Sequence, residues 1–382
     1  MRTRFTIDGS EELEDQLERF CRQVRLRALA QIARRDLEAI VLGGGYGRGE
    51  GGVLQTEVGD RPYNDLEFYV FLRGNRFYQE HRYARLLHNL GESLSRQSGL
   101  QVEFKIDCAD RWRHSPVSMF SYDLLSGHRI ILGDDSVFSK CEHHLDARAI
   151  PLAEAARLMF NRCSGLLLAR ELLQKGALAG DEMDFIGRNH AKLQLALGDA
   201  VLTAFRQYDS SARQRHWRLS SFTPEDSPPQ WPEIQAHHGW GLLFKLHPRR
   251  VVKSVAEFEM EHRRLTDLAM RLWLWLEGRR LNNRFLSASD YALSAVDKCP
   301  GTPLWLNYIL SLRTFGPKAA LAPLSCRYPR GRLFNALALL LWDGKAPAHP
   351  RLLRRLQQEL QTDAPDWAGL VSVFKRIWPR YG

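Results

Sequence analysis

Two carboxylates at alternate positions, Asp65 and Glu67, lie in a largely apolar stretch of this 382-residue sequence. Residues 66–72 predict a strand, in which Asp65 and Glu67 point to the same side. An exposed edge strand could carry the pair without a ligand, but Glu67 lies in a run apolar enough for a central strand, where a carboxylate needs a partner. A divalent cation relieves the repulsion between the two, and Mg²⁺ binds such oxygens together with substrate phosphates.

Closely spaced glycines precede the carboxylates, at positions 43, 44, 45, 47 and 49, directly after an apolar run that ends at Leu42. Glycine lets backbone N–H groups approach phosphate oxygens closely, and Arg48 adds a guanidinium suited to the same charge. A tight turn without a ligand is the alternative for so short a motif. The glycine turn, the arginine and the carboxylate pair together predict a site for a metal-bound nucleoside triphosphate.

These residues, in this order, resemble the signature of the polymerase-β-like nucleotidyltransferase superfamily. Residues 44–50, GGYGRGE, are similar to the Gly-Ser-x-Ala-Arg-Gly-Glu form of many minimal and antibiotic-modifying members. Residues 64–68, NDLEF, are similar to the superfamily's Ser-Asp-apolar-Asp-apolar segment. The resemblance covers roughly the first third of the chain. Residues 51–63 make the connecting loop longer than in compact members, so its register stays open.

The resemblance implies transfer of a nucleoside monophosphate from ATP, or another NTP, to an acceptor with release of pyrophosphate. It implies Mg²⁺, or Mn²⁺, held by Asp65 and Glu67. The nucleotide would be bound by Gly44, Gly45, Gly47, Arg48 and Lys192. Helical domains of the superfamily often lend a lysine to the triphosphate, and Lys192 with Tyr208, Ser210 and Ser211 resembles that arrangement. A surface lysine on an amphipathic helix is the alternative.

The superfamily also uses a third carboxylate on a neighbouring strand. Residues 100–108, LQVEFKIDC, alternate cleanly, with Glu103, Lys105 and Asp107 on one face. We expect Asp107 to bind metal or to activate the acceptor, because it stands at the end of its strand, where ligands gather in open α/β sheets. The segment after it, 112–122, resembles the one that follows the third Asp in glutamine-synthetase-type adenylyltransferases. Glu103 is the alternative, and Lys105 on its face could neutralise it.

The elements that would position these residues form an α+β fold. A small mixed β-sheet with flanking helices is expected over residues 1–140, from a helix at 10–35, a strand at 37–42, a helix at 78–97 and a short strand at 130–133. An α-helical domain is expected over 150–382. Its helices are predicted at 152–175, 188–208, 251–281, 304–312, 332–342 and 350–360, with the clearest loop at 220–232.

Composition is typical of a cytoplasmic enzyme with phosphate-rich partners. The net charge is +10, the six cysteines have no paired spacing, and no stretch is long and apolar enough for a membrane span. The sequence leaves the acceptor open among a protein side chain, a small hydroxylated molecule, RNA and a second nucleotide. Two other interpretations stay open: a catalytically silent sensor that binds nucleotide or RNA, and the enzyme half of a toxin–antitoxin or defence system.

Overall fold

The strands predicted from alternating apolar residues form one mixed sheet in the computed structural model, which describes residues 4–63, 65–321, 324–343 and 348–382. The strand order is β5-β4-β1-β6. Strand β1 (Leu37–Leu42) is antiparallel to both β4 (Leu66–Leu72) and β6 (Arg129–Leu132), and β4 is parallel to β5 (Val102–Asp107). Strands β5 and β6 are therefore the two edges of the sheet, and β4, which carries Glu67, is central.

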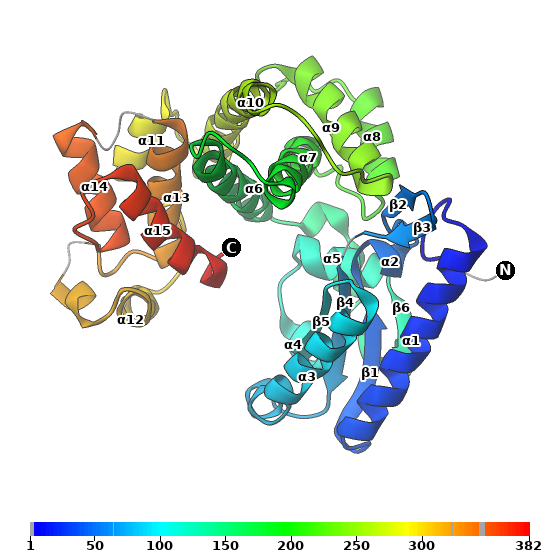
Figure 1. Cartoon of the computed structure of the whole chain (residues 1–382). Helices are drawn as coiled ribbons and strands as arrows, with labels where there is room; N and C mark the ends of the chain where they lie inside the picture. Colours follow the sequence, from blue (N-terminus) through cyan, green and yellow to red (C-terminus); the bar gives the residue numbers. More distant parts are fainter. Residues whose placement is uncertain (1–3, 64, 322–323, 344–347) are drawn as a thin grey trace. The chain divides into compact units, whose positions relative to one another are not determined.

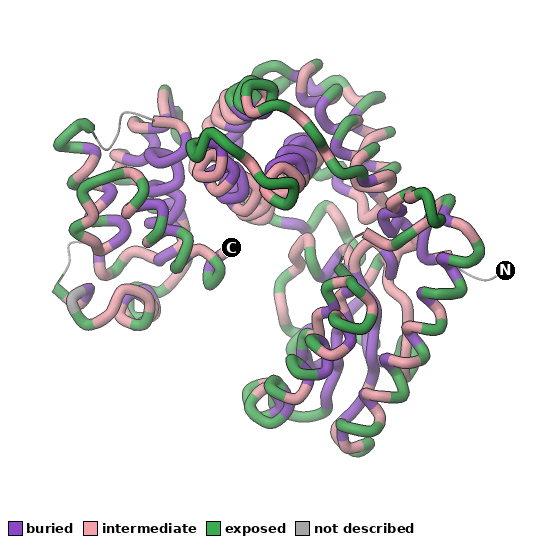
Figure 2. Tube along the Cα trace, viewed as in Figure 1, coloured by how far each residue is buried: buried purple, intermediate pink, exposed green. Residues whose placement is uncertain are grey.

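Alternate residues of the central strands pack on opposite faces of this sheet. Ile40 and Phe68 belong to the core under α1 (Glu11–Gln31) and α3 (Arg76–Ser98). On the other face, Ala39, Val41, Tyr69 and Phe71 pack with residues of α4 (Ala109–His114) and α5 (Met119–Ser126). Figure 2 shows the central strands as buried tubes between exposed helix surfaces. The neighbours of Glu67 along β4 are therefore buried in the two cores, and this packing fixes the position of the Glu67 backbone in the sheet.

Local signals position the first helix and its following strand as predicted. The Ser10 hydroxyl accepts a hydrogen bond from the Leu13 N–H and caps α1. The helix ends at Gln31, four residues before the expected end at position 35, because Ile32 adopts an extended backbone (φ −104°, ψ 129°). The strand at 37–42 has the predicted bounds.

The region between the two predicted motifs contains regular structure that the sequence did not indicate. The glycine turn includes a short helix, α2 (Gly44–Arg48), and the expected long loop forms a hairpin of β2 (Val53–Thr56) and β3 (Gly59–Pro62). Each hairpin strand has only four residues, which is too short for a clear alternation. The connection between the glycine turn and β4 is therefore partly ordered by its own backbone pairing.

The chain divides into two compact units (Figure 1). The sheet unit comprises Met1–Pro151 with two later segments, Phe205–Phe222 and Leu242–Arg249. These segments contain α8 (Ala212–Ser221) and the last residues of α9 (Trp231–Leu246). The expected boundary between 140 and 150 is close to Pro151, but the two helical segments that return to the sheet unit were not anticipated.

The helical unit comprises Leu152–Ala204, Thr223–Gly241 and Arg250–Gly382. Its elements, besides the start of α9, are α6 (Leu152–Leu173), α7 (Gly180–Ala204), α10 (Val255–Leu281), α11 (Ala288–Leu293), α12 (Leu304–Phe315), α13 (Pro329–Leu337) with a π-helix (Ala338–Trp342), α14 (Pro350–Leu360) and α15 (Trp367–Ile377). The predicted loop at 220–232 coincides with the connection from α8 to α9. Among the described helices, none combines the length and the apolar character that crossing a bilayer requires.

Candidate active site

The register of the parallel strands decides which acid lies beside Glu67. Glu67 of β4 is opposite Glu103 of β5, whereas Phe71 is opposite Asp107. Asp107 is thus four residues further along its strand than Glu103, roughly 13 Å in extended chain. The structure brings Glu103 next to Glu67 and leaves Asp107 at the far end, so the position preferred from the sequence does not adjoin the carboxylate pair.

Asp107 instead joins the end of β5 to the start of α4. Its carboxylate accepts hydrogen bonds from the Cys108 N–H (2.9 Å), from Arg111 Nη1 (2.9 Å to Oδ2) and from Trp112 Nε1 (2.8 Å). The residue is buried. These three donors satisfy the carboxylate where the chain turns from strand to helix, so Asp107 has a structural role there. The sequence alone does not distinguish this role from that of a metal ligand.

Three carboxylates act together on the hydroxyl of Tyr69. Burial, then the charges of Glu67, Glu103 and Asp65, raise the pKa of Tyr69 far above its usual value. The Tyr69 hydroxyl lies 3.4 Å from Glu67 Oε2. Asp65 is exposed and directly precedes β4, while Asn64, the first residue of its motif, lies outside the described residues. Asp65, Glu67 and Glu103 therefore form the acidic cluster of this unit.

Lys105 is paired with this acidic cluster. Its ammonium forms an ion pair with Glu67 and lies 3.5 Å from Glu103 Oε2 and 5.5 Å from the centre of the Tyr69 ring. Burial lowers the pKa of Lys105, but the neighbouring charges of Glu67 and Glu103 outweigh burial and raise it overall. Because Lys105 is the one ammonium among the described residues shown paired with this cluster of three carboxylates, the cluster retains an excess of negative charge.

The glycine turn lies directly against Glu67. The Gly43 N–H donates a 3.0 Å hydrogen bond to the Glu67 carbonyl. Gly44 has a left-handed backbone (φ +64°), and a Cβ built there would lie 3.5 Å from Glu67 Oε2. Gly47 is required for close packing instead, because a Cβ there would lie 2.3 Å from the Leu42 carbonyl oxygen. Gly44 and its neighbour Gly45, which lead α2, are thus the glycines positioned to present backbone N–H groups near the carboxylates.

Arg48, one helical turn later, is directed toward α5. Its guanidinium lies 3.8 Å from Asp123 Oδ2, and its side chain, 11% exposed, packs where a Cβ on Gly127 would lie 2.2 Å from Arg48 Cγ. Glu50 has different partners: Ser211 Oγ (2.6 Å) and the Ala212 N–H (2.9 Å) both donate to its buried carboxylate. Burial raises the pKa of Glu50, but these hydrogen bonds outweigh it and lower the pKa overall.

Lys245, near the end of α9, is a candidate that the sequence reasoning missed. Burial and the charges of Arg48 and Arg215 lower its pKa to about 8, although Glu50 and Asp123 oppose the shift. Within the described part of the chain, its ammonium has no hydrogen bond or ion pair. The only signal in the sequence is one lysine inside the apolar run GLLFKL at 241–246, and such a lysine is usually read as a helix-surface residue.

Lys245 belongs to the sheet unit, whereas Lys192 belongs to the helical unit. The ring of Phe244, the residue before Lys245, packs edge-on against Tyr63, two positions before Asp65, with ring centres 6.0 Å apart. Lys192 is exposed on α7 of the helical unit. Of the residues grouped with Lys192, Tyr208 and Ser211 belong to the sheet unit, where they donate hydrogen bonds to Asp123 and Glu50 respectively.

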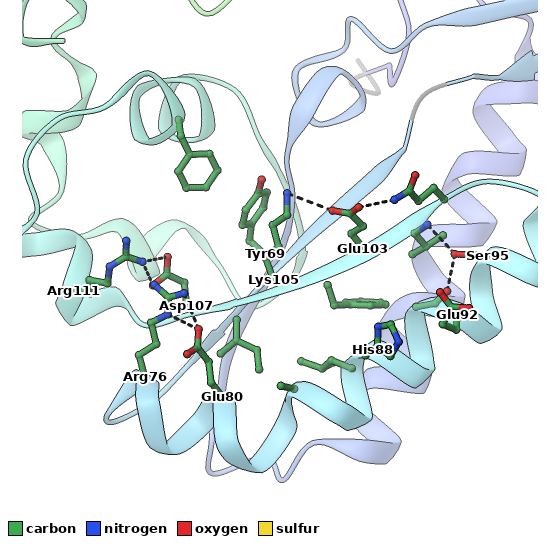
Figure 3. A pocket seen from close by; sticks show the side chains of 18 residues that line it. Tyr69, Arg76, Glu80, His88, Glu92, Ser95, Glu103, Lys105, Asp107 and Arg111 are labelled. Carbon is green, nitrogen blue, oxygen red and sulfur yellow. Dashed lines mark hydrogen bonds and ion pairs between the residues drawn. The ribbon is translucent and has the colours of Figure 1, made fainter. Parts of the chain in front are cut away.

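A groove of about 750 Å³ runs along the open edge of β5, between that strand and α3. Figure 3 shows Tyr69, Lys105 and Glu103 in one part of the groove and Asp107 and Arg111 in another. The exposed Phe120 of α5 also lines it, with its ring 5.1 Å from that of Tyr69. We call this pocket the carboxylate groove. It connects the acidic cluster to a surface large enough for a small molecule or an extended segment.

Among the described residues, no group of three or more His, Cys, Asp or Glu side chains is arranged to hold a metal ion. The ion pair of Lys105 with Glu67 and Glu103 accounts physically for this arrangement, because the ammonium draws both carboxylates to itself. Comparisons of the chain with protein-family models, curated protein sequences and solved structures gave no match.

Proposed function

We propose that this chain is a Mg²⁺-dependent nucleotidyltransferase that moves a nucleoside monophosphate from an NTP, with ATP as the expected donor, to an acceptor hydroxyl. The observation that carries the proposal is the placement of Glu67 opposite Glu103 on neighbouring strands, with the glycine turn at Gly44 directly beside Glu67. The sequence resemblance calls for a glycine turn, a carboxylate pair and a third acid on the next strand. The register supports the proposal, because it sets Glu103 beside Glu67 and hence near the glycine turn.

The residues proposed for each role follow from position. Asp65, Glu67 and Glu103 provide hard oxygen ligands. Gly44 and Gly45 provide backbone N–H groups for the phosphates. Lys245 takes the role expected of Lys192, because a partly buried ammonium without an internal partner is favourable only beside an added negative charge.

The acidic cluster fits a divalent cation in charge and in donor type. Asp65, Glu67 and Glu103 minus the charge of Lys105 leave about two negative charges, which one divalent cation would balance. Metal binding requires the Lys105 ammonium to move away from Glu67, and its side chain, 44% exposed, has room to do so. When bound, Mg²⁺ would supply charge stabilisation at the transferred phosphoryl group.

The reaction balances without another reactant. A new bond forms between the acceptor oxygen and the α-phosphorus, and the bond from the α-phosphorus to the bridging oxygen breaks, so pyrophosphate leaves. Glu103, 37% exposed and lining the carboxylate groove, is placed to accept the proton of the acceptor hydroxyl. Lys245 would neutralise charge on the leaving phosphates.

The test is incubation with α-³²P-labelled NTPs, Mg²⁺ and a cell extract, followed by separation of proteins, RNA and small molecules. We expect label on one class of acceptor with the wild-type chain and none with Glu67→Gln. Omitting Mg²⁺ should also abolish labelling. Labelling that persists in Glu67→Gln at the wild-type rate would contradict the assignment of this site.

A catalytically silent nucleotide-binding protein is the second candidate, and one observation favours it: Lys105 already occupies the two facing carboxylates. The two candidates differ in their response to Lys105→Gln. In an enzyme, the variant binds Mg²⁺ more tightly and still transfers label. In a silent protein it gains metal binding but transfers no label at any Mg²⁺ concentration.

A further inference from the structure

A second cavity lies at the opposite edge of the same sheet, and most of its charged lining is arginine. It has a volume of about 630 Å³ and is bounded by α1, the end of α2 and the edge strand β6. We call it the arginine cavity. Its charged residues are Arg4, Glu18, Arg22, Arg25, Arg48, Arg129 and Asp135. Five arginines and two acids line it, so the lining residues carry three positive charges in excess.

The two acids of the lining already have partners. Glu18 Oε1 lies 3.6 Å from Arg22 Nε, and Asp135 Oδ1 lies 2.9 Å from His128 Nε2. Arg25 is exposed on α1, and no described residue forms an ion pair with it. Arg4 and Arg48 pair with Glu11 and Asp123, which do not line the cavity, so arginine remains the predominant charged residue of the lining.

Packing holds two of these arginine side chains in place before any ligand arrives. The Arg129 guanidinium lies 3.6 Å from the ring centre of the buried Phe5. Arg48 occupies space that a side chain at position 127 would take, so Gly127 is required there. Arginines fixed in this way lose little conformational entropy on binding, and their planar forks suit bidentate contacts with phosphoryl oxygens.

We propose that the arginine cavity binds a ligand with two or more linked phosphoryl groups, either free pyrophosphate or the phosphates of a nucleotide. A linked pair of phosphoryl groups spans several guanidiniums and matches the three excess charges, which a single carboxylate does not. The volume lies in the range of small-ligand pockets. The two cavities share no lining residue, so this proposal does not depend on the proposed nucleotidyl transfer.

The test measures binding of sodium pyrophosphate to the full chain by calorimetry in EDTA. Without divalent cations the acidic cluster repels polyphosphate, and comparison of a lining variant with a matched control assigns the remaining binding to the arginine cavity. The double variant Arg22→Gln/Arg25→Gln removes two exposed lining charges from α1. The control Arg34→Gln/Arg35→Gln removes two exposed charges just after α1 that do not line the cavity. Thermal unfolding of all variants checks the fold.

We expect the lining variant to lose roughly tenfold to a hundredfold in pyrophosphate affinity, the range for charged hydrogen bonds, and the control to bind as the wild type does. Equal affinity for pyrophosphate and ATP would assign recognition to the phosphoryl groups, and tighter binding of ATP would add contacts to the nucleoside. Unchanged affinity in the lining variant, or an equal loss in the control, overturns the proposal. So does binding of a single-stranded RNA 20-mer without any binding of pyrophosphate.

Discussion

The two edges of the central sheet have opposite chemistry. At the β5 edge, Glu103 and Lys105 alternate along the strand beside Glu67, and the carboxylate groove has a slight excess of acids. At the β6 edge, the arginine cavity has an excess of positive charge. The glycine turn lies between the two, because β1 is flanked by β4 on one side and by β6 on the other. One short segment, α2, therefore contributes to both sites.

This difference shows how one sheet can separate metal binding from phosphate binding. Carboxylates attract a divalent cation but repel free phosphates, so polyphosphate approaches the β5 edge only as its metal complex. Guanidiniums at the β6 edge need no metal. Gly44 faces Glu67, whereas Arg48, four residues later, lines the arginine cavity. We therefore expect polyphosphate binding at the β5 edge to require Mg²⁺ and polyphosphate binding at the β6 edge to persist without it.

The largest expected effect is at Glu67, the centre of the acidic cluster. Glu67→Gln, like Asp65→Asn, should lower nucleotidyl transfer on the order of 10²-fold or more, by analogy with the loss of a preorganised charge-stabilising group. Labelling with α-³²P ATP measures it. Glu92→Gln is the matched control, because Glu92 lines the carboxylate groove at the α3 side, outside the acidic cluster, and pairs with Arg96 (3.8 Å). An equal loss of nucleotidyl transfer in Glu67→Gln and Glu92→Gln would mean that the loss is not specific to Glu67, and would contradict its assignment as a metal ligand.

The next effect separates Glu103 from Asp107. Glu103→Gln should lose transfer roughly as much as a general base contributes, on the order of 10²-fold, and keep its unfolding free energy. Asp107→Asn should keep most transfer but lose about 1–3 kcal/mol of stability, because the Arg111, Trp112 and Cys108 donors lose a charged acceptor. Denaturant unfolding and labelling are measured on both. An inactive, fully stable Asp107→Asn would restore the assignment made from the sequence.

Arg48 tests whether the two edges are independent. Because it lines the arginine cavity and also belongs to the glycine turn, Arg48→Ala should weaken both pyrophosphate binding in EDTA and Mg²⁺–ATP-analogue binding, each roughly tenfold. Arg48→Lys should restore only part, since a point charge does not reproduce the fork. Arg25→Gln, by contrast, should affect pyrophosphate alone. If Arg48→Ala leaves ATP-analogue binding unchanged, Arg48 belongs to the β6 edge only.

The local elements of this site could be predicted from the sequence. The apolar alternation of β1, β4 and β5 and the Ser10 cap are local signals, and each predicted element exists close to its expected bounds. The choice between Glu103 and Asp107 could not be made in this way. It depends on the register of β5 against β4, which long-range packing sets: a Cβ on Gly91 of α3 would lie 2.7 Å from the Val102 carbonyl oxygen.

The contribution of later helices to the sheet unit was also beyond local reasoning. Ser211 and Ala212 donate to Glu50 across about 160 residues of sequence, and no periodicity in the chain indicates such a contact. Lys245 was missed for the same reason. Its environment comes from Arg48, Glu50, Asp123 and Arg215, which lie on three other segments. Partners that are distant in sequence, rather than the residue types, identify it.

The smallest expected effect concerns Lys245. Removing its ammonium should raise the unfolding free energy, and the gain should depend on pH. The folded pKa of about 8 lies below the usual 10.5, so the unfolded chain binds more protons between these values. The contribution of Lys245 to the unfolding free energy therefore rises with pH from about 8 to about 10.5, and below pH 8 its buried charge destabilises the fold in full. The whole shift corresponds to roughly 3 kcal/mol, and partial exposure of the side chain reduces it to the order of 1 kcal/mol.

Lys245→Met should therefore be more stable than the wild type at pH 7 and should lose this advantage as the pH approaches 10.5, while its affinity for Mg²⁺–ATP analogue falls. Urea unfolding from pH 6 to 10.5 measures the first effect and calorimetry the second. Lys192→Met, an exposed lysine of α7, is the control and should change stability little at any pH. A stabilised variant with unchanged nucleotide affinity would show that the Lys245 charge is retained for something other than phosphate. A destabilised variant at pH 7 would show instead that Glu50 and Asp123 hold the ammonium more strongly than burial opposes it.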